Sequence, residues 1–221
     1  MHVLTWNLFH GRAVPERPRP LLGEFMDIIS GWPWDVALLQ EVPPWWPPLL
    51  ARAAGAEQRT VLTSRNAVLP ARRWAAERRP DLIKSNGGGS NAILVRGAGI
   101  AEHRTHRLRW WPERRYVHAV RLTDGGWMAN VHATANPKGL AHEDMAEAGV
   151  VVSGWAGDEW AALGGDANVA DPEVEGFTDA GGHRIDRFFV RGAVAVVAEP
   201  RTLPRHGLSD HAPVLTELRP A

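Results

Sequence analysis

The segment 160–168 reads WAALGGDAN, an apolar run that ends in two glycines, a carboxylate and an amide. A short apolar run bounded by turn residues predicts a buried strand, so Asp166 and Asn168 follow directly on its end. Asp, Asn and Gly are also ordinary turn residues, and alone this segment reads as a turn. It decides the fold because the same arrangement recurs along the chain.

Five other predicted strand segments carry polar side chains that a hydrophobic core does not need. These side chains are Asn7 in LTWN (4–7), Glu41 in DVALLQE (35–41), His132 in ANVH (129–132), Asp186 in RIDRFF (184–189), and Asp210 with His211 in LSDHAPV (208–214). In open α/β sheets, functional groups lie just past the strand ends. Carboxylates, amides and imidazoles without thiolates indicate a site for a hard cation.

Short apolar runs separated by turn residues extend over the whole sequence. They predict strands at 2–8, 35–39, 59–63, 91–95, 116–122, 126–132, 160–164, 184–190, 193–198 and 213–218. Apolar residues at helical spacing predict helices at 20–31, 44–54, 71–79 and 138–156, and turn-rich composition predicts loops at 15–20, 85–90 and 170–182. The elements do not form a regular βαβ repeat, and no linker or internal repeat divides the chain. We therefore predict one α/β domain over residues 1–221.

The sequence contains no cysteine, which excludes disulfides, zinc–thiolate sites and cysteine nucleophiles. Its first residues lack the basic and apolar regions of a signal peptide, and no apolar run approaches the roughly 20 residues of a membrane-spanning helix. We expect a cytoplasmic protein without a transmembrane segment, and a monomer is presumed.

The formal net charge is zero, but the charges are unevenly distributed. Between Arg59 and Arg121 there are 14 basic and 4 acidic residues. The arginines of this segment either lie on solvent-exposed faces without a specific role or form a face that attracts a phosphorylated substrate. It also contains Trp110-Trp111, which either fills the core or forms a stacking platform for a base.

The polar motifs as an ordered set resemble a known superfamily. The set is Thr5-Trp6-Asn7, Leu39-Gln40-Glu41, Asn130-Val131-His132, Gly165-Asp166-Ala167-Asn168, Ile185-Asp186 and Ser209-Asp210-His211. In this order it resembles the endonuclease/exonuclease/phosphatase superfamily, the deoxyribonuclease-I-like fold, over essentially the whole chain. The resemblance implies a four-layer sandwich of two packed mixed β-sheets flanked by helices, with the catalytic loops at one end.

The resemblance implies a divalent-metal-dependent phosphoester hydrolase with roles for individual residues. Glu41 is the expected primary ligand of Mg²⁺ or Mn²⁺, supported by the amide oxygen of Asn7, and Asp210 approaches the metal or its waters. Asp166 is expected to orient or deprotonate the attacking water. Asn168 is expected to donate its amide N–H to a phosphate oxygen.

The remaining implied roles involve two histidines and an arginine. Asp186 and His211 form a dyad, in which a protonated His211 stabilises charge on phosphorus or acts as the general base; both readings stay open. His132 faces the phosphate and assists the leaving group, although the segment 90–95 offers no acid to support it. Arg115 aligns with a phosphate-contacting arginine, and a one-residue slip would put Arg114 there instead.

One more histidine, His10, is worth following, because Gly11 lets the chain turn towards Asn7 and the predicted site. The other scattered histidines are expected on the surface or in the core.

Three substrate classes compete for this site. The basic middle segment and Trp110-Trp111 favour a nuclease acting on DNA or RNA. A phosphodiesterase or phosphatase acting on a small molecule, an inositol phosphate or a lipid headgroup is the alternative. A catalytically dead binding module is the least favoured, because all six motifs keep competent residues. We predict a phosphoester hydrolase, leaning to a nuclease.

Overall fold

The computed structural model describes residues 1–63, 68–78 and 89–221. The strands are β1 (His2–Asn7), β2 (Val36–Val42), β3 (Glu57–Thr63), β4 (Gly89–Val95), β5 (Ile100–Arg109), β6 (Arg115–Leu122), β7 (Trp127–His132), β8 (Ala161–Asp166), β9 (Thr178–His183), β10 (Asp186–Arg191), β11 (Val194–Thr202) and β12 (Val214–Pro220). The helices are α1 (Leu22–Gly31), α2 (Pro47–Ala54), α3 (Leu69–Arg78) and α4 (Lys138–Ala156), with a 3-10 turn at Phe9–Gly11.

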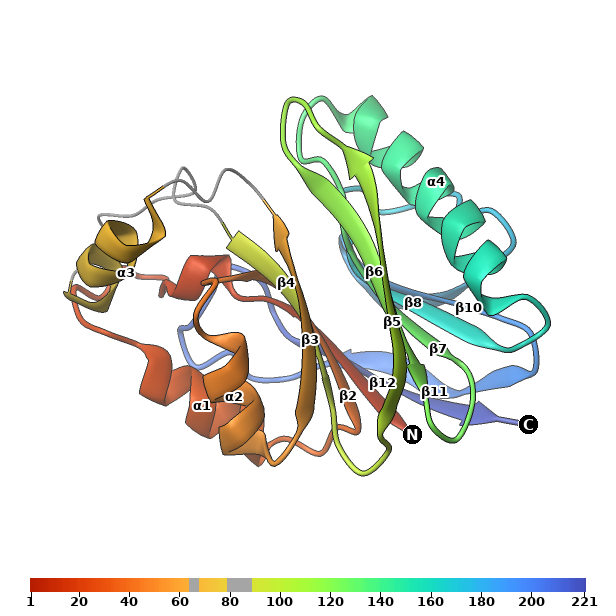
Figure 1. Cartoon of the computed structure of the whole chain (residues 1–221), viewed down its shortest axis with the longest axis horizontal. Coiled ribbons are helices and arrows are strands. Elements are labelled where there is room, and N and C mark those ends of the chain that lie inside the picture. The colour runs from red at the N-terminus through yellow and green to blue at the C-terminus, as the bar shows by residue number, and fades with distance from the viewer. Residues whose placement is uncertain (64–67, 79–88) are drawn as a thin grey trace.

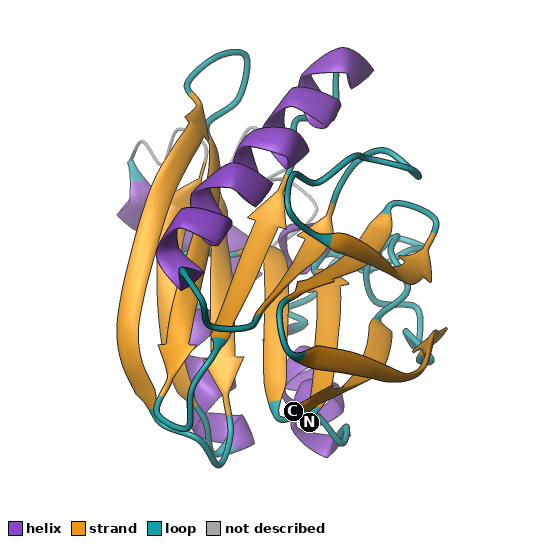
Figure 2. Cartoon of the chain, turned by 90° about the vertical axis from the view of Figure 1, so that its right-hand side faces the viewer, coloured by secondary structure: helices purple, strands orange, loops and turns teal. Residues whose placement is uncertain are grey.

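Two six-stranded sheets pack face to face, and helices cover their outer faces (Figure 1). One sheet has the order β11-β12-β1-β2-β4-β3 and the other β5-β6-β7-β8-β10-β9. Both are mixed: β1 with β2 and β7 with β8 are parallel, and the remaining pairs are antiparallel. Figure 2 shows α4 lying across the outer face of the second sheet. The predicted α/β four-layer sandwich is confirmed.

Three apolar clusters correspond to the three interfaces between the four layers. The first packs α1 and α2 onto the sheet that contains β1, through side chains such as Trp6, Phe25 and Leu50. The second packs α4 onto the sheet that contains β7. The third, which includes Leu38 and Phe188, lies between the sheets. Burying both faces of each sheet explains why the strands are near-continuous apolar runs rather than alternating ones.

The segment 160–168 has glycines where no side chain fits. A Cβ on Gly164 would lie 2.8 Å from both Leu38 Cδ1 and Phe188 Cδ1, so the two sheets approach closely at this point. A Cβ on Gly165 would lie 1.9 Å from Val131 O, and Gly165 has a φ of 148°. The two glycines therefore let β8 run against β7 and the opposite sheet before the chain reaches Asp166.

All ten predicted strands and all four predicted helices are present. The helix at 138–156 has the predicted bounds, the other elements differ at one or both ends, and two of the described strands were not predicted. β5 carries polar residues at most positions and β9 is rich in glycine, so neither shows an apolar pattern. Both are edge strands, which backbone pairing holds with little side-chain burial. The predicted loop at 170–182 is therefore wrong over Thr178–Gly182. The predicted loop at 85–90 is wrong at Gly89 and Ser90, and its other residues lie outside the described ones.

A buried amide joins the two sheets across the sandwich. Asn130 on β7 donates its Nδ2 hydrogens to Leu39 O and Ala92 O of the other sheet, both at 3.0 Å. Its Oδ1 accepts a hydrogen bond from Gln40 Nε2 at 2.8 Å. Gln40 precedes Glu41, and Asn130 lies two residues before His132. The bridge thus fixes the polar strand ends of one sheet relative to those of the other.

The chain termini lie together, at the end of the sandwich away from these strand ends (Figure 1). The Met1 ammonium group donates to Leu218 O at 2.8 Å. Of the helices described, none is long and apolar enough to cross a membrane.

We predict that Asn130→Leu lowers the free energy of unfolding by about 3 kcal/mol, because three buried hydrogen bonds are lost at about 1 kcal/mol each. Urea unfolding followed by circular dichroism measures this loss.

The matched control is Asn91→Leu, in the same layer between the sheets. The amide of Asn91 is buried without a hydrogen-bond partner among the described residues, so its replacement is expected to be neutral or stabilising. Equal losses for the two variants would show that the bridge has no special role.

Candidate active site

Strained backbone gathers at the end of the sandwich that carries the predicted site residues. Phe9, His10, Glu41, Asn168 and Ser209 all have φ between 49° and 58°, a region that residues with a side chain seldom adopt. Each such residue costs of order 1–3 kcal/mol and persists only where surrounding contacts hold it. This concentration marks the end of the sandwich as the candidate site.

Glu41 occupies a bulge near the end of β2. The pairing of β2 with β4 shifts between Leu39 and Val42, so Glu41 turns out of the regular ladder. Its side chain is 22% exposed, and its Oε2 lies 3.1 Å from His10 Nε2. Its Oε1 lies 3.8 Å from His132 Nε2. Glu41 is therefore the partly exposed carboxylate of the site, and the turn at Phe9–Gly11 places His10 next to it.

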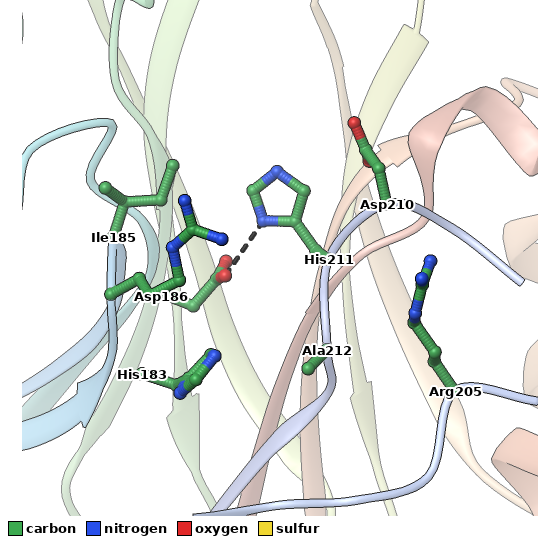
Figure 3. Close-up of a pocket in the computed structure, with 8 residues that line it drawn as sticks. His183, Ile185, Asp186, Arg205, Asp210, His211 and Ala212 are labelled. Atoms are coloured by element: carbon green, nitrogen blue, oxygen red, sulfur yellow. Dashed lines mark hydrogen bonds and ion pairs between the residues drawn. The ribbon is translucent and has the colours of Figure 1, made fainter. Parts of the chain in front are cut away.

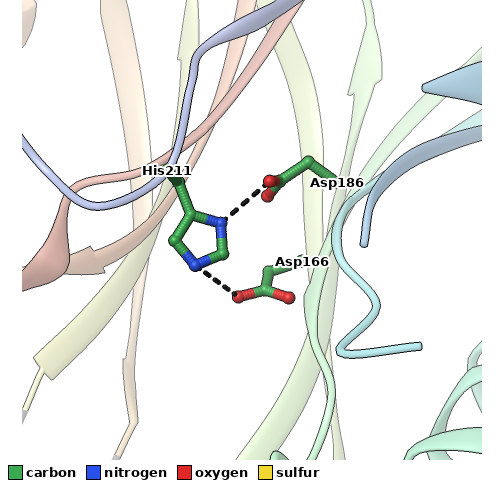
Figure 4. A group of neighbouring side chains, drawn as sticks. All are labelled: Asp166, Asp186 and His211. Carbon is green, nitrogen blue, oxygen red and sulfur yellow. Dashed lines mark hydrogen bonds and ion pairs between the residues drawn. The ribbon is translucent and has the colours of Figure 1, made fainter. Parts of the chain in front are cut away.

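Asp166 lies at the centre of the group and is buried. Its Oδ2 accepts a hydrogen bond from Asn7 Nδ2 at 3.0 Å, and its Oδ1 accepts one from Asn168 N at 2.9 Å. His132 Nε2 lies 3.5 Å from Oδ2. His211 Nε2 lies 3.7 Å from the same oxygen (Figure 4). Both oxygens are thus held in fixed directions, and one of them faces two imidazoles.

The backbone N–H of Phe9 orients the Asn7 side chain. Its Oδ1 accepts the Phe9 N–H at 2.9 Å, and because a backbone N–H can only donate, the amide nitrogen must face Asp166. In this arrangement Asn7 positions Asp166. Its role as a metal ligand through the oxygen stays a prediction.

The structure brings Asp186 and His211 together as the sequence led us to expect. His211 Nδ1 lies 2.8 Å from Asp186 Oδ2 (Figures 3 and 4). The imidazole is also fixed through its backbone: Ser209 Oγ accepts the His211 N–H at 3.0 Å and donates to Asn7 O at 2.6 Å. Trp6 Nε1 donates to His211 O at 3.0 Å.

The two members of this dyad carry opposite charges at neutral pH. Burial raises the pKa of Asp186 to about 6, with Asp166 adding to the rise and the hydrogen bond to His211 opposing it. Burial disfavours the charge on His211, but the hydrogen bond to Asp186 and the surrounding carboxylates outweigh it and raise the pKa of His211 to about 9. A cationic His211 therefore faces Asp166 with its Nε2–H.

His132 has the opposite protonation. Burial, followed by the charge of Arg115, holds the pKa of His132 well below its ordinary value. Arg115 Nη1 lies 2.9 Å from His132 Nδ1, and since a guanidinium can only donate, the His132 proton is on Nε2. His132 is a neutral donor that points towards Asp166 and Glu41.

Arg115 is the partner of His132 that the sequence did not reveal. Its side chain is buried and also bonds to Glu113. In this arrangement it positions His132 and does not line the open site, so the expected phosphate contact by Arg115 stays a prediction. Arg114, the neighbour that a one-residue slip would select, instead lies over the ring of Trp110.

Asn168 is held by the loop that follows β7. Its Nδ2 donates to Ala133 O at 2.9 Å, and its carbonyl oxygen accepts from Lys138 Nζ. Asp144 of α4, fully buried, accepts the Thr134 N–H at 2.8 Å. Lys138 and Asp144 support the site through backbone groups, and for that reason no sequence motif pointed to them.

Asp210 is exposed beside His211, on the far side of the ring from Asp186 (Figure 3). It borders a pocket of about 430 Å³ between the β9–β10 turn and the loop that precedes β12. Three basic residues, His183, Arg184 and Arg205, contribute to the lining of this pocket.

The donor set suits a divalent cation. Glu41, Asp166 and Asp186 bring three carboxylates together, two of them buried, and Asp186 Oδ1 is buried with no partner among the described residues. Buried carboxylates require compensating charge, and oxygen donors are those that hard cations prefer. Ligand atoms of Asp166, Asp186 and His211 also lie within 4.8 Å of one another. Because the protonated His211 has no free lone pair, the two carboxylates are the metal donors of this group.

The layered fold and this group of carboxylates, amides and imidazoles define a class, the phosphoester hydrolases built on a two-sheet α/β sandwich. Residues 4–211 match the model of the Endonuclease/Exonuclease/phosphatase family. The chain belongs to this family, which confirms the resemblance deduced from the motifs. No curated protein sequence matches the chain.

Solved structures share the fold at low sequence identity. An endonuclease/exonuclease/phosphatase from Beutenbergia cavernae is 20% identical with a TM-score of 0.75, over 100% of this chain and 71% of that one. TDP2 from Caenorhabditis elegans is 15% identical with a TM-score of 0.69, over 100% and 74%. The mannosyl-6-phosphatase Bt3783 from Bacteroides thetaiotaomicron is 16% identical with a TM-score of 0.65, over 99% of each chain.

We predict that Arg115→Met lowers kcat on an aryl phosphodiester about 10- to 100-fold, because His132 loses the donor that fixes its tautomer and orientation. KM is expected to change little. Steady-state kinetics measure both constants.

Arg121→Met is the matched control, since Arg121 lies on the same strand and pairs with Glu159 near the opposite end. If Arg115→Met kept the full kcat, the positioning role of Arg115 would be refuted.

Proposed function

We propose that the chain is a nuclease that cleaves phosphodiesters in DNA or RNA and depends on Mg²⁺ or Mn²⁺. The observation that carries the hydrolytic part is the site itself: an oriented buried carboxylate, Asp166, faced by one cationic and one neutral histidine beside the open carboxylate Glu41. The basic middle segment of the chain supports a polyanionic substrate.

The expected cation site centres on Glu41, with Asp210 and the amide of Asn7 as further candidates and Asp166 close by. When bound, the cation would polarise the phosphate and lower the pKa of a water molecule.

The protein's own groups divide the remaining work. Asp166, with its oxygens held by Asn7 and Asn168, is suited to orient the attacking water and to take its proton at Oδ2. His132 Nε2–H and the cationic His211 are suited to donate hydrogen bonds to the phosphate oxygens as negative charge develops there. The raised pKa of His211 favours charge stabilisation over general-base action, because a protonated imidazole has no free lone pair.

A second candidate function is hydrolysis of a small phosphorylated molecule, an inositol phosphate or a lipid headgroup. The pocket beside His211, with Arg184 and Arg205 in its lining, is large enough for such a substrate. The structural likeness to a mannosyl-6-phosphatase is consistent with this class.

We predict that Glu41→Ala and His211→Ala each lower metal-dependent turnover at least about a hundredfold, because metal and transition-state charge interactions contribute several kcal/mol. The assay is a screen of Mg²⁺ and Mn²⁺ against plasmid DNA, RNA, aryl mono- and diesters and inositol phosphates. The exposed Glu199→Ala variant on β11 is the control. Full turnover in both site variants would refute the proposed mechanism, and cleavage of inositol phosphates without any cleavage of nucleic acid would select the second function.

Metal binding is also expected to stabilise the fold, since the cation neutralises gathered carboxylates. Mg²⁺ or Mn²⁺ at about 100 times its Kd adds about 2.7 kcal/mol and raises the melting temperature. Differential scanning fluorimetry measures this rise with no substrate present. The rise should be lost in Glu41→Ala, and its persistence there would place the cation elsewhere.

A further inference from the structure

Two tryptophans at the tip of the β5–β6 hairpin face solvent. Trp110 is 58% exposed and Trp111 is 68% exposed, whereas Trp6 and Trp127 are buried in the layers of the sandwich. Of the two readings that the sequence left open for Trp110-Trp111, core filling is therefore excluded. Adjacent exposed rings of this size are typical of a binding surface.

Arginines lie over one of these rings. The guanidinium of Arg114 is 3.9 Å from the centroid of the Trp110 ring, and that of Arg107 is 5.1 Å away. The nearby acidic side chain, Glu113, is bound to Arg115. The tip thus combines aromatic rings with positive charge, which is the combination that binds single-stranded nucleic acid by stacking and by attraction to the backbone.

The hairpin is braced against the helix beside it. At the tip end of β5, next to Trp110, Arg109 bonds to Asp144 at 2.8 Å and to Glu143 at 2.9 Å, both on α4. The other oxygen of Asp144 holds the Thr134 N–H, two residues past His132. Figure 1 shows the hairpin tip next to the N-terminal end of α4. These bonds therefore fix the position of the hairpin tip relative to the site.

The hairpin also reaches the site through its own chain. Arg115, which bonds to His132, is four residues from Trp111, so the two Cα atoms are at most about 13 Å apart. This short connection ends behind His132, whose Nε2 faces Asp166, and so places the tip on the His132 side of the site. A strand whose phosphate lies at Asp166 and His211 can therefore present a nearby base to the tip.

We propose that Trp110 and Trp111, with Arg107 and Arg114, form a stacking site for an unpaired base of the substrate strand, close to the phosphate that is cleaved. The proposal rests on the proposed nuclease function and narrows its substrate to single-stranded or frayed nucleic acid. A base within a duplex is stacked on its neighbours and paired, so the tryptophan rings at the tip cannot stack on it.

The test compares two fluorescein-labelled single strands of equal length and charge, oligothymidylate and the same backbone with abasic sites in place of every base. Fluorescence anisotropy at low salt with EDTA measures binding without cleavage. Trp110→Ala and Trp111→Ala should each weaken oligothymidylate binding about 5- to 100-fold, the effect of losing one stacked base. Binding of the abasic strand should be weak in the unaltered protein and change less than about twofold in the variants, because it offers no ring.

Trp74→Ala on α3 is the matched control. Trp74 is 60% exposed and also has an arginine, Arg78, over its ring, but it belongs to a different element. It should leave oligothymidylate affinity unchanged, while Trp111→Phe should retain most of it. Because all three rings are exposed, melting temperatures should match that of the unaltered protein.

Equal affinity of the unaltered protein for the two strands, or equal losses in Trp74→Ala and Trp111→Ala, would overturn the stacking site. Either result leaves the nuclease proposal standing if the unaltered protein cleaves nucleic acid with Mg²⁺ or Mn²⁺. Failure to cleave any nucleic acid with either metal defeats the nuclease proposal instead, and the two failures are thereby distinguished.

Discussion

The hydrogen bonds of Asn130 to the opposite sheet are the constraint on which the site depends. Each sheet alone supplies only part of the polar group: Asn7 and Glu41 come from one, and His132 and Asp166 from the other. Apolar packing between sheets is non-directional and would tolerate a small slide. The Asn130 amide bonds to Leu39 O, Ala92 O and Gln40, and a slide of one sheet over the other would break these directional bonds. The bonds therefore fix the position of one sheet relative to the other, and with it the distances across the site.

Two histidines in one site are kept in different protonation states by their partners. His211 has a carboxylate at its Nδ1, and His132 has a guanidinium at the same atom. Burial disfavours the charge on both rings, and more so on His132; the guanidinium adds to this effect at His132, whereas the carboxylates outweigh it at His211. The result is one charged and one uncharged donor facing the same oxygen of Asp166, an arrangement suited to a group whose negative charge increases during reaction.

The sequence predicted what is encoded locally. Asp166 and Glu41 were found because a carboxylate after an apolar run is visible in the chain, and the order of six such motifs identified the family. β5 and β9 were missed because edge strands need no apolar pattern. The partnership of Arg115 with His132, and the support from Lys138 and Asp144, joins segments distant in sequence through buried contacts, and no spacing rule anticipates such contacts.

The proximity of the two chain ends has a practical meaning. Met1 bonds to Leu218 beside the first residue of β1, whereas Asn7 of the site is the last residue of that strand. Neighbouring termini make a fold tolerant of circular permutation and of insertion into another protein. A tether or an affinity label fused at these ends would lie away from the site and leave access to it unobstructed.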